Sequence, residues 1–418
     1  MPPRTLPKKR KTAPVNTVAT PNLKHSLWQG PEKDGITFSL LSRFLCCRER
    51  FRLRVVEGLV EDEGFNHTIE FGSIWHAGEE AFARKNDWAQ AMANYTSVLF
   101  QKYPTDEKEI AKWYSIAKAQ FPIYIDYWRH HPDQRRRRPV LEEAAFRVPY
   151  LLPSGRKVIL RGKFDCVLLL GNSLYLQENK TKGTIDEEGI QKTVAQNLQT
   201  MLYQIALRQS LQHIATAGQN DWFITNICGS RPHESILCEL TPFRSPKRGY
   251  KIGGVIYNVV RRPLADRFAI KQRKSETLPQ FYKRLASVIK GKPDYFFHRW
   301  NVGLQQSDIN RFRQRVFDPI LEQLCDWWEW VSVDPFDPWT PRMLFRVQGS
   351  NEWKLAMVSN THKTPLPRNQ THFQAPWGVY NSLAGGFRGD YFDLLTSEGR
   401  RTSGLRKIDN LYPELTSE

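Results

Sequence analysis

The sequence places Arg161-Gly-Lys-Phe-Asp165 shortly before Tyr175-Leu-Gln-Glu178-Asn-Lys180, and this pair of segments decides the fold. Both segments continue apolar runs, and a Gly-Asn turn signal separates them, as expected for a β-hairpin. Alternate residues of a strand share a face, so Glu178 and Lys180 should project together, within reach of Asp165 on the other strand. Two carboxylates hold a hard divalent cation, and a lysine beside them can orient a water or stabilise charge on a phosphate. The pattern is typical of metal-assisted phosphodiester hydrolysis.

Each of these residues also has an ordinary structural explanation. Asp165 could form a salt bridge with Arg161, and an acid two residues before a lysine is a common surface pattern. His76 lies four residues before Glu80 on an expected helix, so the two could share a face, and a neutral imidazole is a frequent metal ligand. The alternative for this imidazole is a half-buried histidine beside Trp75.

Two further groups are candidates for contact with a phosphate. Gln199 and Tyr203 are four residues apart on an expected helix and could present an amide and a phenol to a phosphate or a water, although packing of a helix flank explains them equally. Four consecutive arginines are Arg135, Arg136, Arg137 and Arg138. A solvated loop is the simplest explanation for this block, and a grip on phosphates is the alternative.

Composition favours a polyanionic partner. The 418 residues carry a formal net charge of +18, which favours nucleic acid through counterion release, with solubility alone as the alternative. Six scattered cysteines do not make a disulfide scaffold, so a reducing interior is expected. No apolar run is long enough to span a bilayer, and the N-terminus lacks the apolar region of an export signal.

Periodicity along the chain predicts an α/β fold. Helical patterns cover 36–59, 71–84, 88–103, 107–128, 187–209, 277–289 and 308–331. Strand patterns cover 140–150, 157–170, 173–180, 222–228, 234–240 and 253–260. Helices first, then a strand meander, then a long helix and more strands is the order of an α/β core. The basic segment Pro7–Lys11 fits either a nuclear import signal or a nucleic-acid-binding arm.

Taken in order, five motifs resemble the RecB-like branch of the PD-(D/E)XK nuclease superfamily, which includes the CRISPR-adaptation nucleases. The motifs are the Ser/Cys/Arg/Phe-rich segment Ser39–Phe51, the Gly-x-x-x-His element Gly72–His76, the strand Arg161–Asp165, the Glu-x-Lys-Thr strand Glu178–Thr181 and the Gln-x-x-x-Tyr helix Gln199–Tyr203. The resemblance covers 36 to about 210, and 253–300 is more loosely similar to phage-type members. It implies a restriction-endonuclease-like core, that is, a central mixed sheet flanked by helices.

The resemblance also implies roles for individual residues. The ligands of Mg²⁺ or Mn²⁺ would be His76, Asp165, Glu178 and the main-chain carbonyl of Asn179. Lys180 would hold the attacking water and share the charge of the phosphate. Gln199 would support the side of Lys180, and Tyr203 would contact the backbone phosphate.

The C-terminal region departs from the pattern of this branch. Many relatives carry a four-cysteine iron–sulfur cluster, with three ligands near the C-terminus, but here no cysteine follows Cys325. A cluster needs thiolate ligands, so none is expected. The aromatic residues expected to pack this region instead are Trp377, Tyr380, Tyr391 and Phe392.

The expected organisation has four parts. They are a disordered basic tail at 1–27, a nuclease core at 28–242 with a helical insertion at about 85–130, a basic mixed α/β extension at 243–334 that ends in a long helix, and a C-terminal region of mixed helix and irregular structure at 335–418. The Trp327-Trp328-Glu329-Trp330 cluster could be a docking surface for a protein partner or part of the core.

These observations together predict a metal-dependent DNA nuclease, with exonuclease action in recombination, repair or phage DNA processing. The alternatives are a catalytically silent nucleic-acid-binding protein, or a subunit of a recombination or packaging complex, on the same fold. The expected location is the cytoplasm of a prokaryotic or phage-infected cell, or the nucleus if the host is a eukaryote. Polarity of cleavage, one metal or two, and DNA against RNA stay open.

Overall fold

A computed structural model of the chain describes residues 26–46, 48–61, 64–132, 137–171, 173–185, 187, 189–216, 251–264, 270–333, 342–346, 353–357, 380–381, 387–388, 405–408 and 410–411. The chain divides into two compact units. The first comprises Met1–Gln29, Ser39–Asp62 and Cys325–Leu411, and the second comprises Gly30–Phe38, Glu63–Leu324 and Tyr412–Glu418. The basic tail up to residue 25, the strands expected at 222–228 and 234–240, and Arg135 and Arg136 lie outside the described residues.

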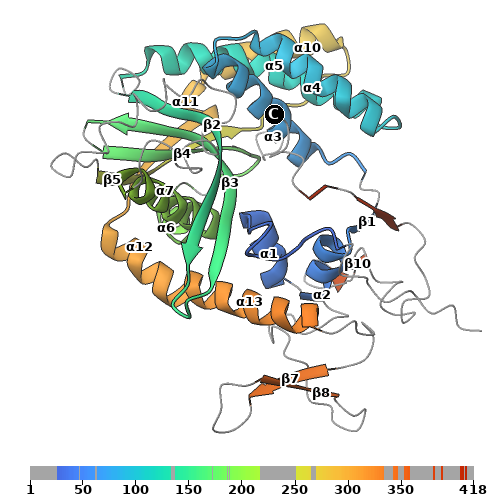
Figure 1. Cartoon of the computed structure of the whole chain (residues 1–418). Coiled ribbons are helices and arrows are strands. Elements are labelled where there is room, and N and C mark those ends of the chain that lie inside the picture. The colour runs from blue at the N-terminus through green and yellow to red at the C-terminus, as the bar shows by residue number, and fades with distance from the viewer. Residues whose placement is uncertain are drawn as a thin grey trace, which may run out of the picture. The chain divides into compact units, whose positions relative to one another are not determined.

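The second unit is built on a five-stranded sheet with the order β2-β3-β4-β5-β6 (Figure 1). The strands are β2 (Arg137–Leu151), β3 (Lys157–Leu170), β4 (Ser173–Lys182), β5 (Lys251–Arg261) and β6 (Phe297–Gly303). β4 and β5 run parallel, whereas all other neighbours are antiparallel. The sheet is therefore mixed, and its strands β5 and β6 come from residues beyond 242.

Helices cover both faces of this sheet (Figure 1). One layer contains α3 (His67–Ala83), α4 (Trp88–Lys102), α5 (Glu107–His130) and α10 (Leu278–Gly291). The other contains α6 (Ile190–Gln196) and α7 (Leu198–Thr216), and α7 contacts β2, β3, β4 and β5. The second unit also contains α11 (Pro293–Phe296), α12 (Gln306–Phe312) and a π-helical turn (Arg313–Phe317). Helix α13 (Asp318–Val333) contains residues of both units. The expected α/β class, a central mixed sheet flanked by helices, is confirmed.

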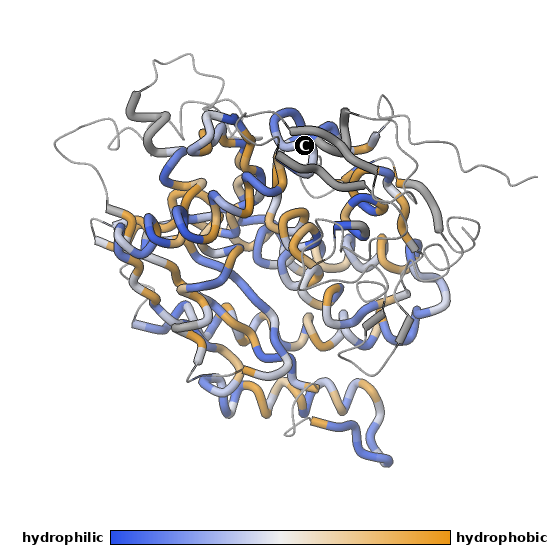
Figure 2. Tube along the Cα trace, turned by 90° about the horizontal axis from the view of Figure 1, so that it is seen from below, coloured by the Kyte–Doolittle hydropathy of each residue, from blue (hydrophilic) through white to orange (hydrophobic). Residues whose placement is uncertain are grey.

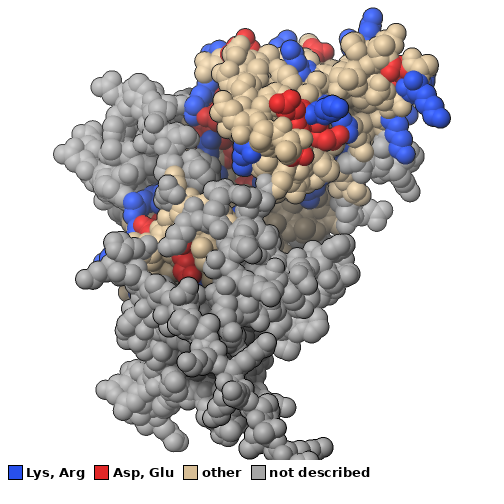
Figure 3. Space-filling model, turned by 90° about the vertical axis from the view of Figure 1, so that its right-hand side faces the viewer, with Lys and Arg blue, Asp and Glu red and all other residues tan. Residues whose placement is uncertain are grey.

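An aromatic core holds the layer of α3, α4 and α5 together. Trp75 of α3 packs edge-on against Phe121 and Tyr124 of α5, with ring centroids 4.9 and 5.3 Å apart. Burial of one such side chain contributes about 1.5–3 kcal/mol. Figure 2 shows hydrophobic residues recurring between hydrophilic ones along helices and strands. On the face drawn in Figure 3, Lys and Arg side chains of the described residues lie among Asp and Glu side chains.

Short-range signals explain where the helices begin. The Asn66 side chain accepts a hydrogen bond of 2.9 Å from the main-chain N–H of Thr68 and caps α3. Asp87 caps α4 by accepting from the N–H groups of Ala89 and Gln90. Because of the Asn66 cap, the helix expected over 71–84 starts earlier, at His67, and Gly72 lies inside it.

Three other expected elements differ from the structure. The helix expected over 36–59 is α1 (Phe38–Cys46), α2 (Arg48–Phe51) and a π-helical turn (Arg52–Val56). The helix expected over 187–209 is divided at Asn197 into α6 and α7, and the one over 308–331 contains the π-helical turn before α13. Apolar spacing does not reveal these breaks, because the buried face continues across each of them.

The arginine block is not simply a solvated loop. Arg137 and Arg138 begin β2 and pair with Leu170 and Leu169 of β3. The ladder then shifts register between Pro139 and Leu141. Proline has no N–H to donate to the ladder, so the strand continues through this position only with an irregularity.

The first unit has its own aromatic core. Trp28 and Phe44 pack edge-on against Phe51, and Trp327 packs against both phenylalanines. Trp328 contacts Trp28 at 4.9 Å between ring centroids. Trp327 is 6% exposed, so its place is in the core and not on a docking surface.

Short strands complete the first unit. β1 (Leu59–Glu61) pairs with β11 (Leu405–Lys407), β7 (Arg342–Arg346) with β8 (Trp353–Met357), and β9 (Tyr380–Asn381) with β10 (Phe387–Arg388). Trp377, Tyr391 and Phe392 lie outside the described residues, so their packing stays a prediction. In the described part of the chain, no helix is both long enough and apolar enough to span a membrane.

Candidate metal centre

Helix α3 lies close against β4 and carries His76 over the sheet. A Cβ atom added at Gly72 would come within 3.3 Å of Oγ1 of Thr181, so a larger residue at this position would push α3 away from β4. His76 follows one turn later on α3 and is one-third exposed. The Gly-x-x-x-His spacing therefore has a physical basis, because the glycine sets the distance between the histidine and the end of β4.

Three side chains converge above the sheet. His76 of α3, Glu143 of β2 and Asp165 of β3 each offer a ligand atom, and these atoms lie within 4.8 Å of one another. All three residues are partly accessible to solvent, although the side chain of Glu143 itself is only 7% exposed. The structure thus brings together two of the expected ligands, His76 and Asp165, and adds a third group, Glu143, that the sequence patterns did not single out.

The other expected carboxylate, Glu178, is almost completely buried in β4. It is 1% exposed, and its Oε2 lies 3.0 Å from Nζ of Lys180 in an ion pair. Its Oε1 has no hydrogen-bond partner among the described residues. Glu178 and Lys180 therefore do project together, as alternate residues of a strand should. A buried carboxylate oxygen without a donor is costly unless a cation or a proton completes it.

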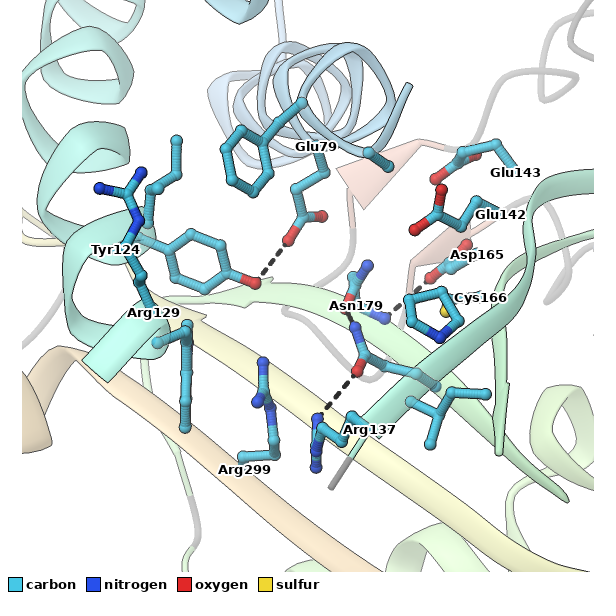
Figure 4. A pocket seen from close by; sticks show the side chains of 17 residues that line it. Glu79, Tyr124, Arg129, Arg137, Glu142, Glu143, Asp165, Cys166, Asn179 and Arg299 are labelled. Carbon is cyan, nitrogen blue, oxygen red and sulfur yellow. Dashed lines mark hydrogen bonds between the residues drawn. The ribbon is translucent and has the colours of Figure 1, made fainter. Parts of the chain in front are cut away.

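A hydrogen-bond network fixes the strand that carries Glu178. The main-chain N–H of Asn179 donates to Oδ2 of Asp165 at 2.8 Å, which ties β4 to β3 beyond their last regular pair (Figure 4). The amide oxygen of Asn179 accepts from Gln177 and from Asn258. Asp165 accepts this bond with one of its two carboxylate oxygens.

The same network continues into the helical layer. Asn258 of β5 donates to the hydroxyl of Tyr124 at 2.7 Å. That hydroxyl donates to Oε1 of Glu79 at 2.9 Å (Figure 4). The second oxygen of Glu79 lies 3.8 Å from Nδ1 of His76. Residues from α3, α5, β4 and β5 are thus held in one arrangement around the candidate site.

Negative charge is crowded at the site. Burial raises the pKa of Glu178 to about 7, with Asp165 acting in the same sense and Lys180 against it. Burial, together with the charge of Asp165, also raises the pKa of Glu143 to about 7. A cation bound among these carboxylates would relieve the repulsion between them.

The same carboxylates raise the pKa values of the two basic groups at the site, His76 and Lys180. Burial lowers the pKa of the His76 imidazole, but Asp165, Glu79 and Glu143 outweigh burial and leave the pKa raised. Burial likewise lowers the pKa of Lys180, and Glu178 and Asp165 reverse the effect, so the pKa of Lys180 is raised. The ammonium group of Lys180 is therefore charged at neutral pH.

Gln199 and Tyr203 lie on α7, on the other side of the sheet from α3. Tyr203 is 8% exposed and packs edge-on against Phe146 and Phe164, with ring centroids 5.4 and 5.9 Å apart. Burial and the charges of Glu178 and Asp165 raise the pKa of Tyr203, and a hydrogen bond with Gln199 lowers it in part. Tyr203 is therefore a core residue whose hydroxyl lies in the electrostatic field of the acids.

A glycine allows this packing. A Cβ atom added at Gly162 would lie 2.6 Å from the ring of Phe146 and 3.0 Å from the ring of Tyr203. The glycine of the Arg161–Asp165 motif thus makes room for the aromatic rings beneath Asp165.

A cavity of about 290 Å³ opens beside the three converging side chains. Glu143, Asp165, Asn179 and Tyr124 line it (Figure 4), and so does Trp128. Three arginines also line it, namely Arg129, Arg137 and Arg299. The guanidinium of Arg299 lies 3.6 Å from the ring centroid of Trp128, and Arg137 donates to Gln177 at 3.2 Å.

Comparison with known protein families identifies the family of this chain. A family model described as the PD-(D/E)XK nuclease superfamily matches residues 36–325, which is more than half of the 418 residues. The chain belongs to the PD-(D/E)XK nuclease superfamily. No curated protein matches it.

Membership of the PD-(D/E)XK nuclease superfamily gives the converging residues a chemical context. Nucleases of this superfamily use divalent metals, and His76, Glu143 and Asp165 form a group able to hold one. The expected resemblance to the superfamily is confirmed, while the RecB-like branch stays a prediction. The sequence did contain one signal for Glu143, because Glu142 and Glu143 lie within a mostly apolar strand.

Proposed function

We propose that this chain is a metal-dependent nuclease that hydrolyses phosphodiester bonds of DNA. The observation that carries the proposal is the convergence of His76 and Asp165 from different elements, with the buried, incompletely bonded carboxylate of Glu178 on the adjacent strand. Membership of a nuclease superfamily supports the same chemistry.

The donor set fits a hard or borderline divalent cation. The proposed ligands of Mg²⁺ or Mn²⁺ are His76, Asp165, Glu178 and the main-chain carbonyl of Asn179. Carboxylate and carbonyl oxygens suit both ions, and the imidazole suits Mn²⁺ better. When bound, such a cation lowers the pKa of a water and neutralises charge on the phosphate.

The chain's own residues have separate tasks in this proposal. Lys180, which forms an ion pair with Glu178, orients the attacking water and shares the charge of the phosphate. The N–H of Asn179 fixes the orientation of the Asp165 carboxylate through their hydrogen bond. Gln199 supports the side of Lys180, and the Tyr203 hydroxyl contacts the backbone phosphate.

The net charge of +18 supports a polyanionic substrate, and DNA is the proposed one. Of the four arginines proposed to contact phosphates, Arg137 lies on the wall of the cavity beside the acids. Exonuclease action in recombination, repair or phage DNA processing is the proposed biological setting.

Incubation of the purified chain with end-labelled linear and with circular DNA tests this proposal. Each substrate is incubated with Mg²⁺, with Mn²⁺ and with EDTA. We expect cleavage with either metal, none with EDTA, and linear DNA degraded while circular DNA persists. DNA binding without cleavage under every metal condition would instead identify a silent binding protein. Cleavage of both substrates would keep the nuclease and reject the exonuclease.

A further inference from the structure

Glu143 occupies a strained position in the sheet. Its φ angle is 48°, in the left-handed region that residues other than glycine rarely adopt. Its neighbours Glu142 and Ala144 pair with Cys166 and Phe164 of β3, the residues on either side of Asp165. Strain of this kind persists only where the surrounding structure holds it, and it concentrates at functional sites.

The kink at Glu143 places its carboxylate beside two residues that already form part of the proposed site. The ligand atoms of Glu143, Asp165 and His76 lie within 4.8 Å of one another, but Glu178 is not a member of this group. One cation could therefore contact Glu143, Asp165 and His76 together, while Glu178 would serve a different position.

The surroundings of His76 point to a ligand on its imidazole. Glu79 is nine-tenths buried, and its Oε2 makes no hydrogen bond within the described part of the chain. This oxygen lies 3.8 Å from Nδ1 of His76. A carboxylate facing one ring nitrogen is the usual partner of a histidine whose other nitrogen binds a metal.

We propose that Glu143 is a metal ligand and that His76, Glu143 and Asp165 form a cation position of their own, separate from the one completed by Glu178. Asp165 is shared between the two positions. The inference rests on the proposed function, since it adds a second cation to the same site. Glu79 orients the imidazole so that Nε2 faces the cation.

The ligand atoms of the Glu143 position favour some divalent cations over others. With two cations, the His76 imidazole belongs to this position together with the carboxylates of Glu143 and Asp165. The position at Glu178 then keeps only oxygen donors, from Asp165, Glu178 and the main-chain carbonyl of Asn179. Mg²⁺ strongly prefers oxygen ligands, and nitrogen ligands favour Mn²⁺ over it. The Glu143 position therefore takes Mn²⁺ in preference to Mg²⁺.

A structural role for Glu143 is the competing explanation. Its Oε2 forms an ion pair of 2.9 Å with Nζ of Lys163, and the same ammonium group lies 3.3 Å from Glu80. If Glu143 served only to pair with Lys163, then removing Glu80 would have a similar effect, because both acids hold the same lysine. Glu80 is not part of the converging group, so Glu80→Gln is a matched control.

The experiment is a titration of the full, metal-stripped chain with Mn²⁺. Electron paramagnetic resonance measures the concentration of free Mn²⁺ at each step, and calorimetry measures the heat of binding. Wild type and Glu80→Gln should each bind two Mn²⁺ ions. Glu143→Gln should bind one of them at least tenfold more weakly, and so should His76→Gln, which changes a different element. Glu178→Gln should lose the other ion. Mg²⁺ should compete with Mn²⁺ more weakly at the position that Glu143→Gln removes.

Unfolding temperatures of the metal-stripped proteins, measured alongside, separate binding from folding. Wild-type Mn²⁺ binding by Glu143→Gln, or equal weakening by Glu80→Gln and Glu143→Gln, would overturn the inference. If wild type cleaves DNA but Glu143→Gln still binds two ions, only this inference fails. If wild type binds no Mn²⁺ and cleaves no DNA, the proposed function fails as well.

Discussion

At the scale of single residues, the candidate site combines several carboxylates with the positive charge of Lys180. Glu178 is buried, and the ion pair with Lys180 is the contact that compensates its charge in the described structure. The same lysine is proposed to act on the attacking water. Asp165 is held by the N–H of Asn179, so its position does not depend on Lys180.

We predict that Lys180→Met lowers the rate of DNA cleavage by about 10²–10⁴, because a positioned group that transfers protons or stabilises charge contributes on that order. Single-turnover cleavage of a labelled duplex measures the effect. Lys182→Met is the matched control, since Lys182 is the next lysine on the same strand and lies over the ring of Tyr257. Equal losses in the two variants would contradict a specific role for Lys180.

The proposed phosphate contact of Tyr203 can be separated from its packing. Tyr203→Phe keeps the ring against Phe146 and Phe164 and removes only the hydroxyl. We expect cleavage to fall about tenfold, as for loss of a hydrogen bond to a charged group, while the unfolding temperature stays close to that of wild type. Wild-type cleavage by this variant would leave Tyr203 with a packing role alone.

The sequence identified the residues of the site unevenly. Asp165, Glu178 and Lys180 could be found because they follow apolar runs at strand spacing, and that spacing determines which side chains share a face. Glu143 could not be found in this way, because its position depends on a backbone kink.

At the scale of elements, the site depends on the close approach of helices to the sheet. α7 reaches β3 because Gly162 leaves room for two aromatic rings, and α3 reaches β4 at Gly72. The spacing of α4 and of the strands β3 and β4 followed well from the periodicity of their apolar residues. The breaks between α1 and α2 and between α6 and α7 did not, because tertiary packing overrides periodicity there.

We predict that Gly162→Ala lowers the free energy of unfolding by about 1–3 kcal/mol, since the added methyl group overlaps rings that have little freedom to move. Denaturation with urea measures the change. Gly291→Ala is the control, because nothing lies within 4 Å of its added Cβ. A Gly162→Ala protein as stable as wild type would contradict the described packing of Tyr203.

The stability that the ion pair of Glu276 and Arg284 gives to the start of α10 should depend on pH. Glu276 accepts from Nε and Nη2 of Arg284 at 2.7 and 2.8 Å, and these hydrogen bonds hold the pKa of Glu276 at about 2. The folded-state pKa lies below the ordinary value of 4.5, so the pair stabilises the fold above about pH 4.5 and loses its effect as the pH falls towards 2.

Glu276→Gln should therefore be less stable than wild type at pH 7, and the difference should narrow steadily below pH 4.5. Denaturant unfolding at a series of pH values measures it. A difference that stays constant from pH 7 to pH 3 would show that the ion pair with Arg284 does not set the pKa of Glu276.

At the scale of the whole molecule, the second unit holds every residue of the candidate site, and the matched family region ends at residue 325. The strongly positive net charge belongs to the whole chain, and on the face shown in Figure 3 charges of both signs are interspersed. Composition alone therefore predicted the class of partner but not the surface that meets it. The four expected domains stay a prediction.

The central claim is that carboxylates on β3 and β4 catalyse DNA cleavage through a bound cation. Its most direct test compares wild type with Asp165→Ala and Lys180→Ala, using end-labelled DNA and Mn²⁺, with DNA binding measured at several salt concentrations. We predict that both variants lose cleavage and keep the salt-dependent binding. Cleavage at the wild-type rate by both variants would contradict the account.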